Sequence, residues 1–226
     1  MNDPRRWTAV VIYAIAMALL EAAVVTYLRT FLGRVDPYQP SPLPAPAWLM
    51  RTEIAREVAT LVMLGAIGWL AGRNWRARLG YFLVAFGAWD IFYYMFLAPM
   101  SGWPRSLLDW DVLFLIPLPW WGPVLAPVCI AALMVVGGTL ITQFGKGEGA
   151  LWPGRIWWML SLAGALLALT VFMADALHAP KWSEEALAKI LPVAFQWPLF
   201  ALALALMSAP VVDMCRQLRR GAKKQI

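Results

Sequence analysis

Five ionisable residues occur in apolar segments of the sequence, where a lipid bilayer would surround them. They are Glu21, Glu53, Arg56, Glu57 and Asp90. A charged side chain near the middle of a bilayer costs at least about 2.5–3.5 kcal/mol, so these side chains are expected to face one another or an internal cavity. Buried carboxylates can hold a proton, bind a cation or join an arginine in binding a polar ligand. The sequence therefore predicts a ligand, proton or ion site inside the membrane.

Helical spacing gathers these residues on single helix faces. Two triplets share the positions i, i+3 and i+4, which lie on one side of a helix. The triplets are Glu53, Arg56 and Glu57, and Asp90, Tyr93 and Tyr94. Arg56 is expected to pair with Glu21 or Asp90 from a neighbouring helix, because its guanidinium group can bind two carboxylate oxygens. Tyr93 and Tyr94 would form hydrogen-bonding walls of the site.

The elements that position these residues are predicted to be membrane-spanning helices. The chain is 62% hydrophobic and 14% charged, whereas a soluble domain carries about 25% charged residues. Six apolar segments are each long enough to cross a bilayer, at 7–28, 48–72, 79–99, 123–144, 156–177 and roughly 191–213. We predict an all-α polytopic membrane helix bundle of about six transmembrane helices. Residues 1–226 would form a single integral membrane domain.

The basic residues predict the orientation of the bundle. If the N-terminus is cytoplasmic, 12 of the 19 basic residues lie on the cytoplasmic side, as the positive-inside rule requires. They are Arg5, Arg6, Arg73, Arg76, Arg78, Lys146, Arg155, Arg216, Arg219, Arg220, Lys223 and Lys224. Both termini are then cytoplasmic, and the five ionisable residues lie in the outer half of a multi-pass protein of the cell inner membrane. The net charge of +6 is explained by this orientation, because the cytoplasmic face of a bilayer is anionic. The expected partner is therefore the lipid bilayer, and no nucleic-acid partner is expected.

The segment before the fourth span has an unusual composition. Residues 112–121 form a short apolar run that Pro117 and Pro119 interrupt, so a regular helix is disfavoured. The run suits an interfacial or re-entrant segment better than a span. Trp120 and Trp121 would either form an outer lid over the site or anchor the segment at the membrane surface. The sequence leaves both alternatives open.

Cofactor and catalytic signatures are sparse. His178 is the single histidine, which excludes a bis-histidine haem held by this chain alone. No Cys-x-x-Cys motif occurs, so neither haem nor an iron–sulfur cluster is expected from this chain alone, and any other cofactor is unknown. We predict no metal site. Phosphate-binding loops and hydrolase nucleophile motifs are missing, so catalytic residues stay unknown and enzymatic activity undecided.

Three functions are compatible with these features. The leading hypothesis is an inner-membrane protein that binds or transports a small molecule, a proton or an ion. It is favoured because four carboxylates exceed what one arginine can pair. In topology alone the chain resembles the small six-span substrate-binding subunits of vitamin importers. The alternative is a non-catalytic subunit or assembly factor that joins other membrane subunits and whose charges only lock helices together. A third is a small membrane enzyme acting on a lipid or isoprenoid, with a carboxyl group as general acid.

Overall fold

The computed structural model describes residues 3–38, 47–116, 118–144, 151–177 and 194–223. The helices in these residues are α1 (Pro4–Phe31), α2 (Ala47–Ala71), α3 (Trp75–Ser101), α4 (Leu125–Gln143), α5 (Arg155–Phe172), α6 (Ala174–Leu177), α8 (Trp197–Met207) and α9 (Ala209–Lys223). Six helical spans are long and apolar enough to cross a membrane, the sixth formed by α8 and α9 in succession. The predicted all-α polytopic bundle with six spans is confirmed.

The helix ends follow local sequence signals. Asp3 caps α1 by accepting a hydrogen bond from the backbone N–H of Arg6, and Asn74 caps α3 in the same way. Gly102 ends α3 with a φ of 73°, a left-handed conformation that glycine adopts without steric cost. The sixth span begins at Trp197, later than predicted, because Pro198 fits only the first turn of a helix. Residues 191–193 lie outside the described residues.

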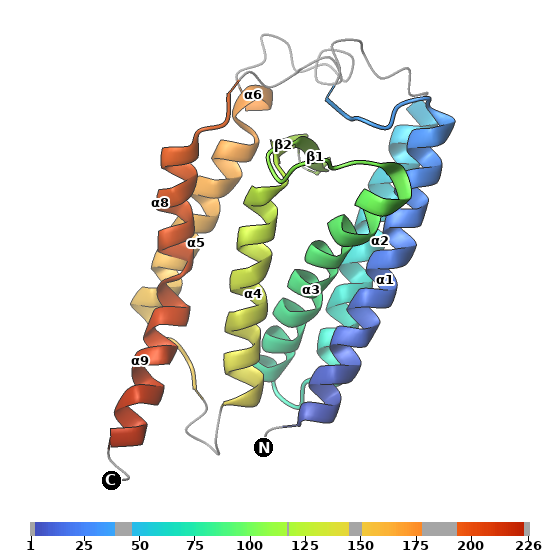
Figure 1. Ribbon diagram of the computed structural model, residues 1–226. Helices are drawn as coiled ribbons and strands as arrows, with labels where there is room; N and C mark the ends of the chain where they lie inside the picture. The colour runs from blue at the N-terminus through green and yellow to red at the C-terminus, as the bar shows by residue number, and fades with distance from the viewer. Residues whose placement is uncertain (1–2, 39–46, 117, 145–150, 178–193, 224–226) are drawn as a thin grey trace.

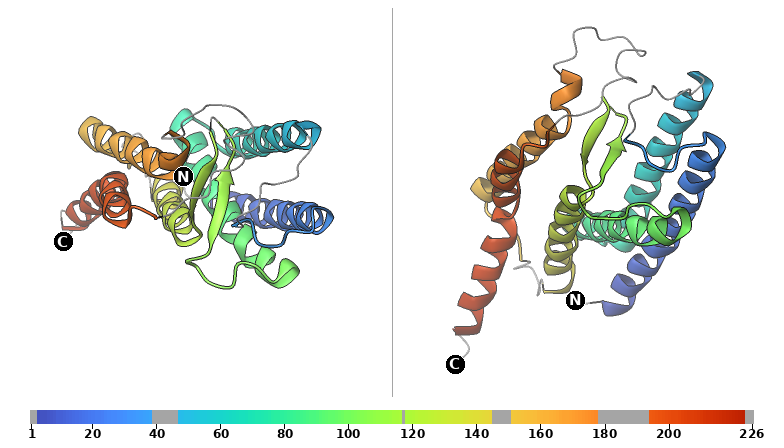
Figure 2. Two further views of the ribbon diagram at one scale, coloured as in Figure 1. Left: turned by 90° about the horizontal axis from the view of Figure 1, so that it is seen from above. Right: turned by 45° about the horizontal axis from the view of Figure 1, so that its top comes forward.

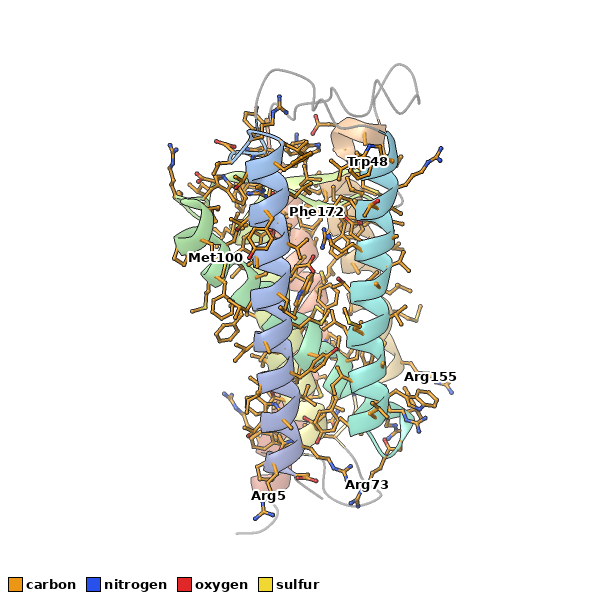
Figure 3. The ribbon with its side chains drawn as sticks, turned by 90° about the vertical axis from the view of Figure 1, so that its right-hand side faces the viewer. Arg5, Trp48, Arg73, Met100, Arg155 and Phe172 are labelled. Carbon is orange, nitrogen blue, oxygen red and sulfur yellow. The ribbon has the colours of Figure 1, made fainter. Side chains whose placement is uncertain are left out.

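Helix α3 is the centre of one group of helices. It packs against α1, α2 and α4, while α5 packs mainly against α8 (Figure 1). The start of α1 and the end of α9 lie at the same end of the bundle. We call the opposite end the distal end. Helices α1 and α2 pack on α3 far more than on each other, and side chains occupy the space between them (Figure 3).

Basic residues gather at the end where α1 begins. Arg5, Arg73 and Arg155 all lie there (Figure 3). This arrangement is the one that the positive-inside rule predicts for a cytoplasmic end. Lys146 and Lys224 lie outside the described residues. The assignment of this end to the cytoplasm, and of the distal end to the outer side, stays a prediction.

The segment before the fourth span forms a β-hairpin. Strands β1 (Trp110–Phe114) and β2 (Trp120–Pro123) pair antiparallel, with Trp110 opposite Pro123 and Phe114 opposite Trp120. Figure 2 shows the hairpin lying across the distal end of the bundle. The segment is therefore not helical, as its prolines predict, and strand pairing satisfies backbone groups that a helix would otherwise satisfy. A strand pair was not predicted from the sequence.

Close packing of α3 on α4 depends on glycine. A Cβ atom on Gly87 would collide with the backbone oxygen of Ala131, and one on Gly138 would collide with that of Gly80. Small residues allow such close approach between membrane helices. The closely packed α3–α4 pair supports the α3 side chains of the candidate site.

Substitution of Gly87 by alanine is expected to destabilise the protein by about 1–3 kcal/mol, because the two backbones must move apart. Gly65→Ala is the matched control, since a Cβ atom at Gly65 meets nothing within 4 Å. Unfolding in mixed detergent micelles, followed by tryptophan fluorescence, measures both changes. Equal stability of the two variants would contradict the inferred α3–α4 contact.

Candidate functional site

A cavity of about 210 Å³ lies in the distal half of the bundle. Its walls are formed by α1, α2, α3 and β1. All seven residues predicted for the site line it, namely Glu21, Glu53, Arg56, Glu57, Asp90, Tyr93 and Tyr94. The structure thus brings together residues from three helices that the sequence placed at similar depth. Their role in function stays a prediction.

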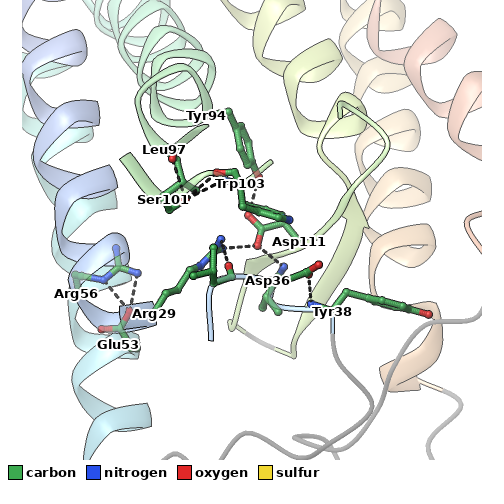
Figure 4. Close-up of polar contacts among 12 residues, drawn as sticks. Arg29, Asp36, Tyr38, Glu53, Arg56, Tyr94, Leu97, Ser101, Trp103 and Asp111 are labelled. Carbon is green, nitrogen blue, oxygen red and sulfur yellow. Dashed lines mark hydrogen bonds and ion pairs between the residues drawn. The ribbon is translucent and has the colours of Figure 1, made fainter. Parts of the chain in front are cut away.

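Arg56 joins α2 to α1. Its guanidinium group forms an ion pair with Glu21 of α1. The Nη2 and Nε atoms of Arg56 lie 2.8 Å and 2.9 Å from Oε2 of Glu53, one turn earlier on α2 (Figure 4). The hydroxyl of Thr60 donates a 3.4 Å hydrogen bond to the second oxygen of Glu21. Of the two partners expected for Arg56, the structure pairs it with Glu21 and not with Asp90.

Glu57 holds the hairpin. Its side chain is buried, and both of its carboxylate oxygens accept hydrogen bonds from the backbone N–H of Leu115, at 3.1 Å and 3.2 Å. Leu115 directly follows β1. A carboxylate that lines the cavity therefore also fixes the end of the strand that forms one of its walls.

Arg29 and Asp111 form a second ion pair, which the sequence reasoning missed. Asp111 of β1 is 2% exposed, and its Oδ1 lies 2.9 Å from Nη2 of Arg29 at the end of α1. The hydroxyl of Tyr94 donates a 3.2 Å hydrogen bond to Oδ2 of Asp111 (Figure 4). The Arg29 guanidinium group also lies 4.2 Å from the centre of the Trp103 ring. Arg29 lies on the same i+4 row of α1 as Glu21. This spacing was the one sequence signal that could have placed Arg29 in the site.

Burial raises the pKa of Asp111 above the usual range of an aspartate. Arg29, the Tyr94 hydroxyl and the backbone N–H of Val112 act in the opposite direction, since each favours the ionised carboxylate. Asp111 is thus a deeply buried acid whose charge depends on these three partners.

Asp90 differs from the other acids of the cavity. Among the residues that the structure describes, its carboxylate has no hydrogen bond and no ion pair, and the same holds for the Tyr93 hydroxyl. Trp89 beside it is 5% exposed, and its buried indole N–H also lacks a partner in this part of the chain. The α3 wall of the cavity therefore presents polar groups that the protein itself leaves unsatisfied.

The cavity wall carries an excess of negative charge. Its ionisable side chains are Arg29, Arg34 and Arg56, and Glu21, Glu53, Glu57, Asp90 and Asp111. Three arginines against five carboxylates leave a formal charge of −2 when all are ionised. An excess of negative charge in a partly buried wall favours bound protons or a bound cation.

The two tryptophans for which the sequence left a lid and a surface anchor open lie on the second strand of the hairpin. Trp120 and Trp121 are in β2 and do not line the cavity. The Trp120 ring stacks on Phe172 of α5, with ring centres 6.3 Å apart, and so faces the neighbouring helix pair. Residues 111–115, from β1 and the residue after it, line the cavity. If the hairpin acts as a lid, β1 is the strand that contacts the site.

The described residues hold no group of three or more His, Cys, Asp or Glu side chains arranged to bind a metal ion. His178 lies outside this part of the chain. Comparisons with protein-family models, with curated proteins and with solved structures gave no match. The function is therefore inferred from the residues of the cavity themselves.

Proposed function

We propose that this integral membrane protein binds a small molecule in its distal cavity, as a receptor or the capture site of a transporter. The observation that supports this most is Asp90, a carboxylate without a protein partner on the wall of a 210 Å³ cavity. Polar groups that serve only to hold membrane helices together pair with one another, as Arg56 does with Glu21 and Glu53. An acid left unpaired in such a place calls for a ligand or a proton.

The size of the cavity limits the ligand. An apolar protein cavity of about 150 Å³ holds benzene. Pockets for drug-sized molecules run from about 300 to 1,000 Å³. A volume of about 210 Å³ thus suits a molecule somewhat larger than benzene, and it exceeds what a proton alone requires.

The position of the cavity indicates where the ligand comes from. With both termini in the cytoplasm, the distal half is the outer half of an inner-membrane protein, and the ligand enters from the non-cytoplasmic side. The hairpin covers this end and is fastened to α2 through Glu57 and to α1 through the pair of Asp111 with Arg29. Both fastening points line the cavity. Binding in the cavity can therefore be coupled to movement of the hairpin.

A second candidate, a non-catalytic subunit or assembly factor, is favoured by a different observation. Arg56 satisfies Glu21 and Glu53 across two helices, which is the contact expected when buried charges serve to lock helices together. Under this hypothesis, Asp90 would be paired by a partner subunit. The two candidates predict different purified samples: a chain that carries a small molecule, or a chain that arrives with partner chains.

Substitution of Asp90 by asparagine is expected to leave the ligand-free protein as stable as the wild type, because Asp90 has no partner to lose. The wild type, purified from its own membrane, should lose thermal stability on extensive dialysis, since a ligand at 100 times its Kd adds about 2.7 kcal/mol. Asp90→Asn should show no such loss. Thermal unfolding before and after dialysis measures both effects.

Asp213→Asn is the matched control for this experiment. Asp213 accepts hydrogen bonds from Gly154 and Gln217 at the other end of the bundle, and asparagine retains an acceptor oxygen. This variant should respond to dialysis as the wild type does. An equal response of the wild type and Asp90→Asn would contradict binding at Asp90.

A further inference from the structure

We infer that the ligand of the distal cavity is a small organic cation, an amine or a quaternary ammonium compound. This inference rests on the proposed function and specifies the chemical class of the ligand. Four features of the cavity support it: the charge balance of the wall, the pairing of the arginines, the aromatic side chains beside Asp90, and the cavity volume.

The first feature is the sign of the unpaired charge. Glu21 and Glu53 are paired with Arg56, and Asp111 is paired with Arg29. Glu57 accepts a backbone N–H. Asp90 is the carboxyl group of the wall that has no such contact within the described residues, so the open polar site is an acid that a cation can bind in its ionised form. A cation is the ligand that such a site attracts.

The second feature disfavours an anionic ligand. An anion would need the guanidinium groups, but Arg29 and Arg56 already bind carboxylates, and Arg34 also has an interaction partner. An anion would have to displace these carboxylates and leave them without a cation in positions that are buried or partly buried. Breaking a buried pair in this way is strongly unfavourable.

The third feature is the aromatic composition of the wall around Asp90. Trp89, Tyr93, Tyr94 and Phe114 all line the cavity. The rings of Trp89 and Tyr93 lie 6.3 Å apart, and those of Tyr93 and Tyr94 lie 4.9 Å apart. Aromatic faces attract ammonium groups, and the attraction grows when the cation is removed from water. One carboxylate beside several aromatic rings is a suitable environment for an organic ammonium ion.

The fourth feature separates an organic cation from a metal ion or a proton. A metal ion needs several donor groups, and the described residues contain no cluster of three. A proton does not need a cavity of about 210 Å³. An organic cation uses one carboxylate, the aromatic faces and the volume together.

Three probes of nearly equal shape test the inference. Choline carries a trimethylammonium group, 3,3-dimethyl-1-butanol replaces its nitrogen by carbon and is neutral, and 3,3-dimethylbutanoate is an anion with the same branched end. Binding of each to the dialysed wild-type protein is measured by isothermal titration calorimetry. Choline is expected to bind at least about tenfold more tightly than the neutral alcohol, since both charge and cation–π attraction favour it.

Asp90→Asn is expected to abolish the preference for choline, while Asp213→Asn retains it. Equal or tighter binding of the alcohol or of the anion would overturn the cation assignment and leave small-molecule binding intact. No binding of any probe would also overturn it. A native ligand found on the wild-type protein by mass spectrometry would then preserve the proposed function, and its absence would remove both.

Discussion

Replacement of Arg56 by leucine is expected to lower the free energy of unfolding by up to about 3–5 kcal/mol, because it leaves the partly buried carboxylates of Glu21 and Glu53 without their cation. Arg56 contacts one carboxylate on α1 and one on α2, so its loss affects both walls of the cavity. Glu21 would keep only the 3.4 Å hydrogen bond from Thr60. The two acids would then repel each other or take up protons, and α1 would separate from α2.

The measurement is equilibrium unfolding in mixed micelles for the wild type and two variants. Arg51→Leu is the matched control, because Arg51 lies on the same helix and is exposed. Arg56→Lys should be intermediate, since lysine keeps the charge but cannot bind two carboxylates with one planar group. If Arg56→Leu were as stable as Arg51→Leu, the ion pairs of Arg56 would not hold α1 and α2 together.

Replacement of Asp111 by alanine is expected to have a similar cost, up to about 3–5 kcal/mol, because the partly buried guanidinium group of Arg29 loses its carboxylate. The Tyr94 hydroxyl and the backbone N–H of Val112 lose an acceptor as well. This change should release β1 from α1 and α3, while Glu57 still holds the residue after the strand. The hairpin should therefore loosen without unfolding of the helices.

A double-mutant cycle tests this prediction. Arg29→Leu combined with Asp111→Ala should recover part of the stability that either single change removes, because no buried charge is then left alone. Amide hydrogen exchange of residues 110–123 reports the state of the hairpin. If the effects of the two changes were simply additive, and exchange in the hairpin did not increase, the inferred anchoring would be wrong.

The sequence was sufficient to predict the membrane-spanning architecture. Six spans follow from the length of the apolar segments. Helices α1 and α3 begin at Pro4 and Trp75, before the predicted residues 7 and 79, because Asp3 and Asn74 cap them. The start of the sixth span was placed too early, because the apolar composition continues beyond the helix and only Pro198 limits it. The β-hairpin could not be predicted, since its pairing depends on contacts between residues 110–114 and 120–123 and includes a register shift.

The candidate site was predicted only in part. Helical spacing and depth identified Glu53, Arg56 and Asp90, which do line one cavity. Arg29 was missed because an arginine at the end of a span usually reaches the membrane surface. Asp111 was missed because nothing in its local sequence shows that β1 folds back over the helices. These two residues are brought to the cavity by tertiary structure alone.

Native mass spectrometry of the gently solubilised protein, purified from its own membrane, tests small-molecule binding most directly. We expect a reproducible small-molecule mass on the wild-type chain, and its loss in Asp90→Asn but not in Asp213→Asn. A chain that carries no small molecule and arrives instead with partner chains at fixed stoichiometry would contradict binding in the cavity. The buried charges would then serve to hold helices and subunits together.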